Sequence, residues 1–143
     1  MTVPEQMKYL TANSLHFWMM LKHFHWAVRG PRFTEMHEFF GEYADLVYGH
    51  IDPIAERIRM ADVDVPADLF TKYRTADPIP SLECPRDMLD ASDMMANYFC
   101  TKMRAAVTAA ETASDYGTVD LLSKAIQDHE KQRWFIRQLL KDE

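Results

Sequence analysis

The sequence predicts an all-α fold, a four-helix bundle, and three observations lead to it. Only four glycines occur in 143 residues, beside ten methionines and eight phenylalanines, whereas a β-sandwich or barrel of this size needs many turn glycines. Long stretches without Pro or Gly carry apolar residues at intervals of three and four, the helical period. Four of the seven prolines gather in one stretch, residues 61–85. The length suits one domain, so we expect residues 1–143 to share a single core.

The first predicted helix runs from Pro4 to about Arg29, where Gly30-Pro31 ends it. A helix that packs only within its own domain shows one apolar stripe, but this one is apolar on more than one face. The surplus residues are Phe17, Trp18, Met19, Met20, Phe24 and Trp26. We therefore expect a second partner surface on this helix; the alternative is a helix at the centre of its own bundle.

The second predicted helix runs from Thr34, its expected first residue, to Ala61. Its apolar positions follow the helical period: Met36, Phe39, Phe40, Tyr43, Val47, Ile51, Ile54 and Ile58. Pro53 lies inside this helix and removes the hydrogen bond to the carbonyl of Gly49. The sequence therefore predicts a bend near Gly49.

The proline-rich stretch reads as a long crossover with one short helix at residues 67–73. A third helix is expected from Arg86 to Ala113 and a fourth from Thr118 to Lys141, separated by a short break. The third has a core stripe at Met88, Ser92, Met95, Phe99, Met103, Ala106 and Ala110. The crossover makes the second and third helices parallel. Two helical hairpins joined in this way form a ferritin-like bundle.

Charge and cysteine content exclude several classes of protein. A formal charge of −6 argues against binding nucleic acid through the folded body, because phosphate binding depends on concentrated Lys and Arg. Cys84 and Cys100 form neither a disulfide framework nor a thiolate zinc motif, which fits a reducing cytoplasm. The start MTVPEQMKYL lacks the pattern of a signal peptide, and no apolar run reaches the ~18 residues of a membrane span. We expect a soluble, unprocessed cytoplasmic protein.

Two histidines and two carboxylates are the candidate metal ligands. In a hairpin that turns at Gly30-Pro31, His25 precedes the turn by about five residues and His37 follows it by about six, so both imidazoles lie at similar height. Asp52 and Glu56 are four residues apart and project from one helix face. Such mixed imidazole and carboxylate ligation suits iron, zinc or manganese.

One chain is not expected to close this site. From His37 to Asp52 is fifteen residues, or about 22 Å along a helix, whereas metal–ligand bonds are about 2 Å long. An antiparallel two-fold dimer would bring the histidines of one subunit beside the carboxylates of the other. A di-iron site inside one bundle would use Glu-x-x-His motifs, and a zinc hydrolase would use His-Glu-x-x-His; the sequence contains neither.

Taken together, these residues resemble the Dps proteins (DNA-binding proteins from starved cells), the mini-ferritins. The resemblance covers nearly the whole chain and rests on His25-Trp26, Gly30-Pro31 with Phe33, His37, Asp52 with the segment 54–58 (IAERI), Asp115, Thr118, Asp120, Glu130-Lys131 and Trp134. It implies a hollow dodecamer built from two-fold dimers. It also implies ferroxidase sites between subunits, oxidation of Fe(II) preferably by hydrogen peroxide, with oxygen as the other possible oxidant, and storage of ferric iron inside.

The resemblance also implies roles for individual residues. His25, His37, Asp52 and Glu56 correspond to the ferroxidase ligands, and Trp26 to the aromatic residue beside the site. Trp26 would take up stray oxidising equivalents or serve only as an interface aromatic.

Two further positions bear on how iron is bound and admitted. Many members carry a further Asp where this chain has Gly41, so we expect one well-formed iron site and a labile second one. Asp115 and Asp120 resemble the acidic residues of a three-fold pore; the alternative is a helix start with Thr118 or a neighbour as the cap.

The remaining histidines are expected to have no metal-binding role: His16 and His23 in packing or interfaces, and His50 and His129 partly exposed. Two alternative functions stay open. One is a nucleoid-associated, DNA-binding protective cage, which the negative charge argues against. The other is a passive cage whose site is degenerate because of Gly41 and Pro53.

Overall fold

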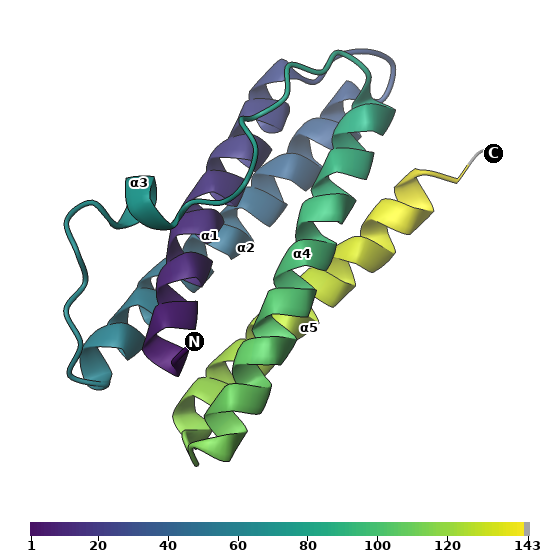
Figure 1. Ribbon diagram of the computed structural model, residues 1–143. Helices are drawn as coiled ribbons and strands as arrows, with labels where there is room; N and C mark the ends of the chain where they lie inside the picture. Colours follow the sequence, from purple (N-terminus) through teal and green to yellow (C-terminus); the bar gives the residue numbers. More distant parts are fainter. Residues whose placement is uncertain (142–143) are drawn as a thin grey trace.

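The computed structural model describes residues 1–141, and over that range it contains five helices and no strand. Four long helices are paired as two hairpins, α1 with α2 and α4 with α5, and the short α3 lies in the crossover (Figure 1). The helices α2 and α4 run in the same direction, as predicted from the long crossover. The all-α bundle topology predicted from the sequence is therefore confirmed.

The first hairpin is made by α1 (Val3–Ala27) and α2 (Phe33–Met60). Thr2 caps α1, since its hydroxyl accepts a hydrogen bond from the backbone N–H of Glu5 at 3.3 Å. The helix ends two residues earlier than predicted because Val28 is extended, with φ −60° and ψ 143°. Gly30 then adopts φ +113°, a conformation that L side chains rarely adopt, and the chain reverses.

The helix α2 begins at Phe33, one residue before the predicted start at Thr34, and Arg32 occupies its N-cap position. The helix continues through Pro53 to Met60. The crossover helix α3 (Leu69–Tyr73) confirms the predicted short helix, and α4 (Pro85–Thr112) and α5 (Tyr116–Leu139) lie within two residues of their predicted bounds.

The bundle has two layers. In Figure 1, α1 and α4 lie on the near side with the crossover, and α2 and α5 lie behind them. Large apolar side chains fill the space between the layers; those with almost no exposure include Phe17, Leu21, Phe24, Phe40, Tyr43, Ile54, Ile58, Met88, Phe99 and Met103. Burial of this apolar surface is the main force that holds the bundle together.

The outward apolar surface on α1 is smaller than the sequence predicted. Phe17, Met20 and Phe24 are at most 3% exposed and belong to the core of the subunit itself. Met19 and Trp26 face outward, 44% and 69% exposed. The outward apolar face of α1 is therefore a strip along one side of the helix.

Asn13 fixes the crossover to α1. Its side chain is fully buried and donates to the carbonyl of Tyr73 at 3.2 Å, while its oxygen accepts the backbone N–H groups of Thr75 and Ala76 at 3.0 and 3.1 Å. A buried amide that satisfies backbone groups on both sides of a loop end holds that loop in one position. This contact fixes the crossover after α3.

Candidate metal centre

The hairpin brings His25 and His37 into direct contact. Their rings stack with centroids 3.7 Å apart and an interplanar angle of 15°. Nδ1 of each ring lies 2.6 Å from the backbone carbonyl oxygen of the other histidine. The two imidazoles therefore lie at one level, as the hairpin spacing predicted.

These reciprocal bonds determine which nitrogen can bind a metal. A carbonyl oxygen only accepts, so Nδ1 of each ring carries the proton and donates it. The lone pair of each neutral ring then lies on Nε2. Metal-binding histidines commonly have this arrangement, in which a backbone carbonyl orients the ring through its other nitrogen. The hairpin thus presents two pre-oriented nitrogen ligands.

Gly41 provides the space in which the His25 ring lies. A Cβ atom at this position would be 2.8 Å from both Cε1 and Nδ1 of His25, closer than Cβ atoms approach other groups. The position was interpreted from the sequence only as a missing ligand. In the structure its lack of a side chain is what allows the imidazole to pack against α2.

Phe33 was given no role by the sequence reasoning, and its ring stacks on His37 with centroids 4.9 Å apart. This contact could have been predicted from the position of Phe33 four residues before His37, which places both on one face of α2.

Trp26 is largely exposed, and its ring lies 5.9 Å from the ammonium group of Lys22.

The two candidate carboxylates lie elsewhere on the subunit. Asp52 and Glu56 are exposed, a single turn apart on α2, and four turns beyond His37. Within residues 1–141, no three His, Cys, Asp or Glu side chains are close enough together to hold a metal ion. The subunit alone brings together the histidines and leaves the carboxylates apart from them.

Asp115 caps α5 and pairs with α2. Its carboxylate accepts the backbone N–H and the hydroxyl of Thr118 at 3.2 and 2.6 Å, and Arg57 donates to it at 2.7 Å. Burial alone would raise the pKa of Asp115, but the hydrogen bonds from Thr118 and the charge of Arg57 outweigh it and lower that pKa. Asp120 is exposed and lies 3.4 Å from Lys124.

The expectation that His50 and His129 are partly exposed was wrong. His50 is 9% exposed, and His129 is 1% exposed. Both continue a core stripe, since His50 lies seven residues after Tyr43, and His129 lies seven after Leu122. These positions indicate burial, which the prediction missed because histidine is a polar residue. His16 is also buried, as its expected packing role requires.

No helix in residues 1–141 is both long enough and apolar enough to cross a membrane.

Comparisons with known proteins identify the family. The family model for the ferritin-like domain matches residues 5–143. A DNA protection during starvation protein of Mycolicibacterium smegmatis is 31% identical over 130 residues, which cover 89% of this chain and 69% of that protein.

Solved structures agree. The X-ray structure of Dps from Thermosynechococcus elongatus matches with a TM-score of 0.91 and 31% identity, covering 99% of this chain and 91% of that one. The Dps protein from Vibrio cholerae O1, described as a member of a broad superfamily of ferritin-like diiron-carboxylate proteins, matches with a TM-score of 0.87 and 25% identity, covering 97% and 89%. The chain is a member of the Dps family of ferritin-like proteins.

Proposed function

We propose that this protein is a mini-ferritin that oxidises Fe(II), preferably with hydrogen peroxide, at sites between its subunits and stores the ferric product in a hollow dodecamer. The observation that supports this most is the histidine pair. His25 and His37 present two oriented Nε2 atoms, and the described part of the subunit supplies no further metal-binding group beside them. A pre-formed half of a site fits a protein whose other half comes from a second copy.

In the proposed site, Asp52 and Glu56 of a neighbouring subunit complete the ligand set. A two-fold axis that brings the two hairpins together antiparallel creates two equivalent sites, because an isologous contact repeats every pairing. Iron is the substrate here. Carboxylate ligands favour Fe(III) over Fe(II), so their addition promotes loss of an electron to peroxide.

Exposed apolar side chains support such a contact on the first hairpin. Met19 and Trp26 on α1 and Tyr48 and Met60 on α2 are 44–69% exposed. Apolar patches of this kind, rimmed by polar residues, mark sites of protein association. Trp26 is placed by this proposal at the dimer interface beside the iron site, where it takes up stray oxidising equivalents.

We further propose that Asp115 and Asp120 line a three-fold pore that draws Fe(II) into the cage. Arg57 compensates part of the charge of Asp115. Asp120 has the more exposed side chain, at 72%, and is the stronger attractor.

The inter-subunit arrangement has a direct test by subunit mixing. His37→Ala and Asp52→Ala cages should each oxidise Fe(II) with peroxide more than about tenfold slower than the unmodified protein, since each lacks a ligand. In a mixed dimer, one site combines both defects and the other has neither. Refolding the two variants together should therefore restore activity, to roughly half in each mixed dimer.

Two controls accompany this test. Asp90→Ala removes an exposed carboxylate on α4 and should leave the rate unchanged. Light scattering of each sample reports the assembly. Failure of the mixture to regain activity, in cages of normal size, would contradict the inter-subunit site, and an unmodified cage that oxidises Fe(II) no faster than either single variant would favour a passive cage.

We propose that the cage does not retain DNA and resides in the cytoplasm. Each chain carries a formal charge of −6, and twelve such chains repel a polyanion. A gel shift at about 100 mM salt tests this, and robust retardation of duplex DNA would instead support a nucleoid-associated cage.

A further inference from the structure

A tyrosine and a histidine form a hydrogen-bonded pair in the centre of the bundle. The hydroxyl of Tyr43 on α2 lies 2.7 Å from Nδ1 of His129 on α5. Tyr43 has no exposed surface, and His129 is 1% exposed. The iron chemistry proposed above uses neither residue.

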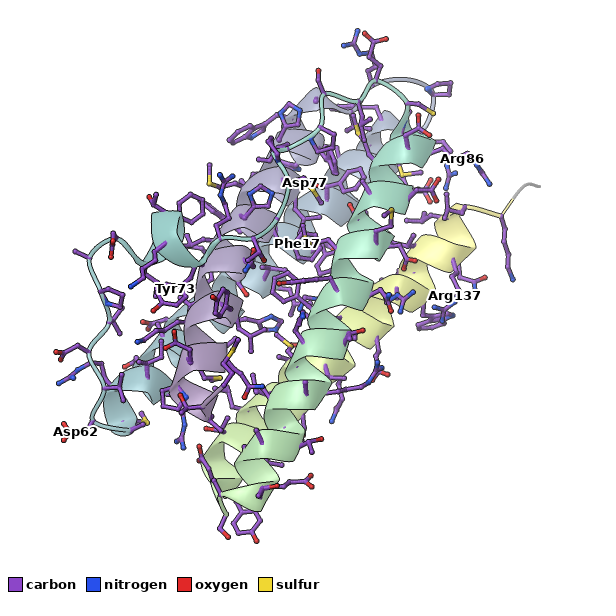
Figure 2. The ribbon with its side chains drawn as sticks, viewed as in Figure 1. Phe17, Asp62, Tyr73, Asp77, Arg86 and Arg137 are labelled. Carbon is purple, nitrogen blue, oxygen red and sulfur yellow. The ribbon has the colours of Figure 1, made fainter. Side chains whose placement is uncertain are left out.

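Aromatic rings surround this pair and exclude water from it. The ring of His129 lies nearly parallel to Phe99, at 5.3 Å and 14°, and to Phe17, at 6.0 Å and 20°. Phe17 also packs edge-on against Tyr43 at 5.2 Å. Figure 2 labels Phe17 where α1 faces the other helices.

The surroundings keep both hydrogen-bonded groups neutral. Burial, and to a smaller extent His50, lowers the pKa of His129 to about 3, so its ring is neutral. Burial likewise raises the pKa of Tyr43 well above its ordinary value, so the phenol keeps its proton. A phenol that donates to the lone pair on Nδ1 uses its only hydrogen, and the proton of the ring then lies on Nε2, a buried atom with no hydrogen-bond partner in the described structure.

A phenol whose proton already points at a base is suited to losing an electron. An oxidised phenol is a very strong acid, so electron loss is easiest when the proton leaves in the same step. Nδ1 of His129 is positioned to receive it. The same burial keeps the resulting radical away from solvent and from exposed side chains.

We propose that Tyr43 is a redox-active residue that supplies one electron to the peroxide reaction while its phenolic proton moves to Nδ1 of His129. This inference rests on the proposed ferroxidase function. It supplies an electron donor at a site where Gly41 offers no ligating side chain, a position from which we predicted a labile second iron.

The electron balance explains why a donor is useful. Hydrogen peroxide accepts two electrons, but one Fe(II) gives only one, leaving Fe(III), hydroxide and a hydroxyl radical. Tyr43 reduces that radical to hydroxide and becomes a neutral tyrosyl radical, and His129 becomes protonated. A second Fe(II) then returns one electron, the proton goes back to the phenol oxygen, and two Fe(II) have been oxidised per peroxide.

Position and charge are compatible with this role. Tyr43 follows His37 by six residues on α2, an axial rise of about 9 Å. The carboxylates of Asp93 and Asp128 act electrostatically on Tyr43, and Arg133 opposes them.

The first test detects the radical directly. Cages loaded with Fe(II) are mixed with peroxide, frozen within the reaction time and measured by electron paramagnetic resonance. We expect a tyrosyl signal that narrows when the protein contains ring-deuterated tyrosine and not when it contains ring-deuterated tryptophan. The signal should be lost in Tyr43→Phe and retained in Tyr98→Phe, the same change at a tyrosine of α4 whose hydroxyl lies 3.1 Å from that of Thr75.

Two further readouts separate a redox role from a structural one. A spin trap should collect more hydroxyl adduct from Tyr43→Phe than from the unmodified cage, although both have the same size and far-ultraviolet circular dichroism. In the unmodified protein, deuterated solvent should slow the rise of the radical, because the proton moves with the electron. His129→Gln, which keeps a polar group but no base, should lower the radical yield, and the solvent effect decides the question where this variant does not fold.

A metal-free arm distinguishes failure of this proposal from failure of the ferroxidase proposal. Photogenerated tris(bipyridine)ruthenium(III) serves as the one-electron oxidant, and a long-lived tyrosyl radical is expected in the unmodified protein and not in Tyr43→Phe. Iron oxidation without a tyrosyl signal, or the same signal in Tyr43→Phe, would overturn the redox role. If the protein does not oxidise iron but the metal-free experiment produces a Tyr43 radical, the result would support the redox role of Tyr43 and count against the ferroxidase proposal.

Discussion

Gly41→Ala should reduce iron oxidation while leaving the stability of the fold almost unchanged. The added Cβ atom would lie 2.8 Å from Nδ1 of His25, and an ordinary contact begins near 3.4 Å. The ring therefore has to move by about 0.6 Å or rotate, because atoms in close contact repel steeply below their optimal separation. Nδ1 is the same atom that donates to the carbonyl of His37, so that bond is lengthened or lost.

Two opposing contributions to the free energy of unfolding nearly cancel in Gly41→Ala. Alanine is favoured over glycine in a helix interior by about 1 kcal/mol. Loss of one partly buried hydrogen bond costs about 0.5–1.5 kcal/mol. The free energy of unfolding should therefore change by less than about 1 kcal/mol. The rate is far more sensitive, since displacement of a catalytic group by about 1 Å can cost up to a hundredfold.

Gly49→Ala is the matched control. It makes the same substitution in the same helix, but a Cβ atom at Gly49 meets no neighbour within 4 Å. We expect it to gain about 1 kcal/mol, or about 2–4 °C in Tm, at unchanged iron affinity and rate.

The assays are anaerobic Fe(II) titration, stopped-flow oxidation by peroxide, and urea unfolding at a fixed subunit concentration. Wild-type iron affinity and rate in Gly41→Ala, together with a stability gain equal to that of Gly49→Ala, would show that the close packing of His25 has no bearing on iron.

Three further predictions address other parts of the subunit. The pKa of His129 is about 3 in the folded protein and ordinarily about 6.5, so between these pH values the unfolded chain binds more protons than the folded one. The contribution of His129 to the free energy of unfolding is therefore fully present above about pH 6.5 and is smaller by roughly 2 kcal/mol at pH 5. Chemical unfolding at both pH values should show this loss, and His129→Phe should flatten it. Asn13→Ala leaves the backbone N–H groups of residues 75–76 without their partner and should cost about 2–4 kcal/mol, with faster hydrogen exchange confined to the crossover. Asp115→Asn combined with Asp120→Asn keeps a capping side chain and should slow iron uptake at low salt, a difference that disappears at high ionic strength; equal uptake at all salt concentrations would count against the pore.

Much of the fold could be predicted because it is encoded locally. Helical periodicity and the prolines of the crossover gave four long helices, one short helix and the parallel arrangement of α2 and α4. The predicted helix ends differ from the observed ones by one or two residues because several side chains compete for each capping position. Asp115 rather than Thr118 caps α5, for example, since it accepts two hydrogen bonds there and pairs with Arg57.

The site could be predicted where it depends on neighbours along the chain and not where it depends on three-dimensional packing. His25 and His37 converge because a short turn fixes their relative height. The close approach of His25 to Gly41 depends on the separation of two helices, which no spacing reveals. The burial of His129 was missed because the average behaviour of histidine was weighed above its position on a core stripe.

The reciprocal bonds between His25 and His37 have a consequence for the order of events in the cell. They join residues only twelve positions apart, so this part of the chain closes with little loss of loop entropy and is expected to form early in folding. Under the proposed arrangement the carboxylates arrive only with a second subunit. A newly made subunit would then hold iron weakly without turning it over, and oxidation would begin only once two subunits have paired, the first step towards the cage that receives the product.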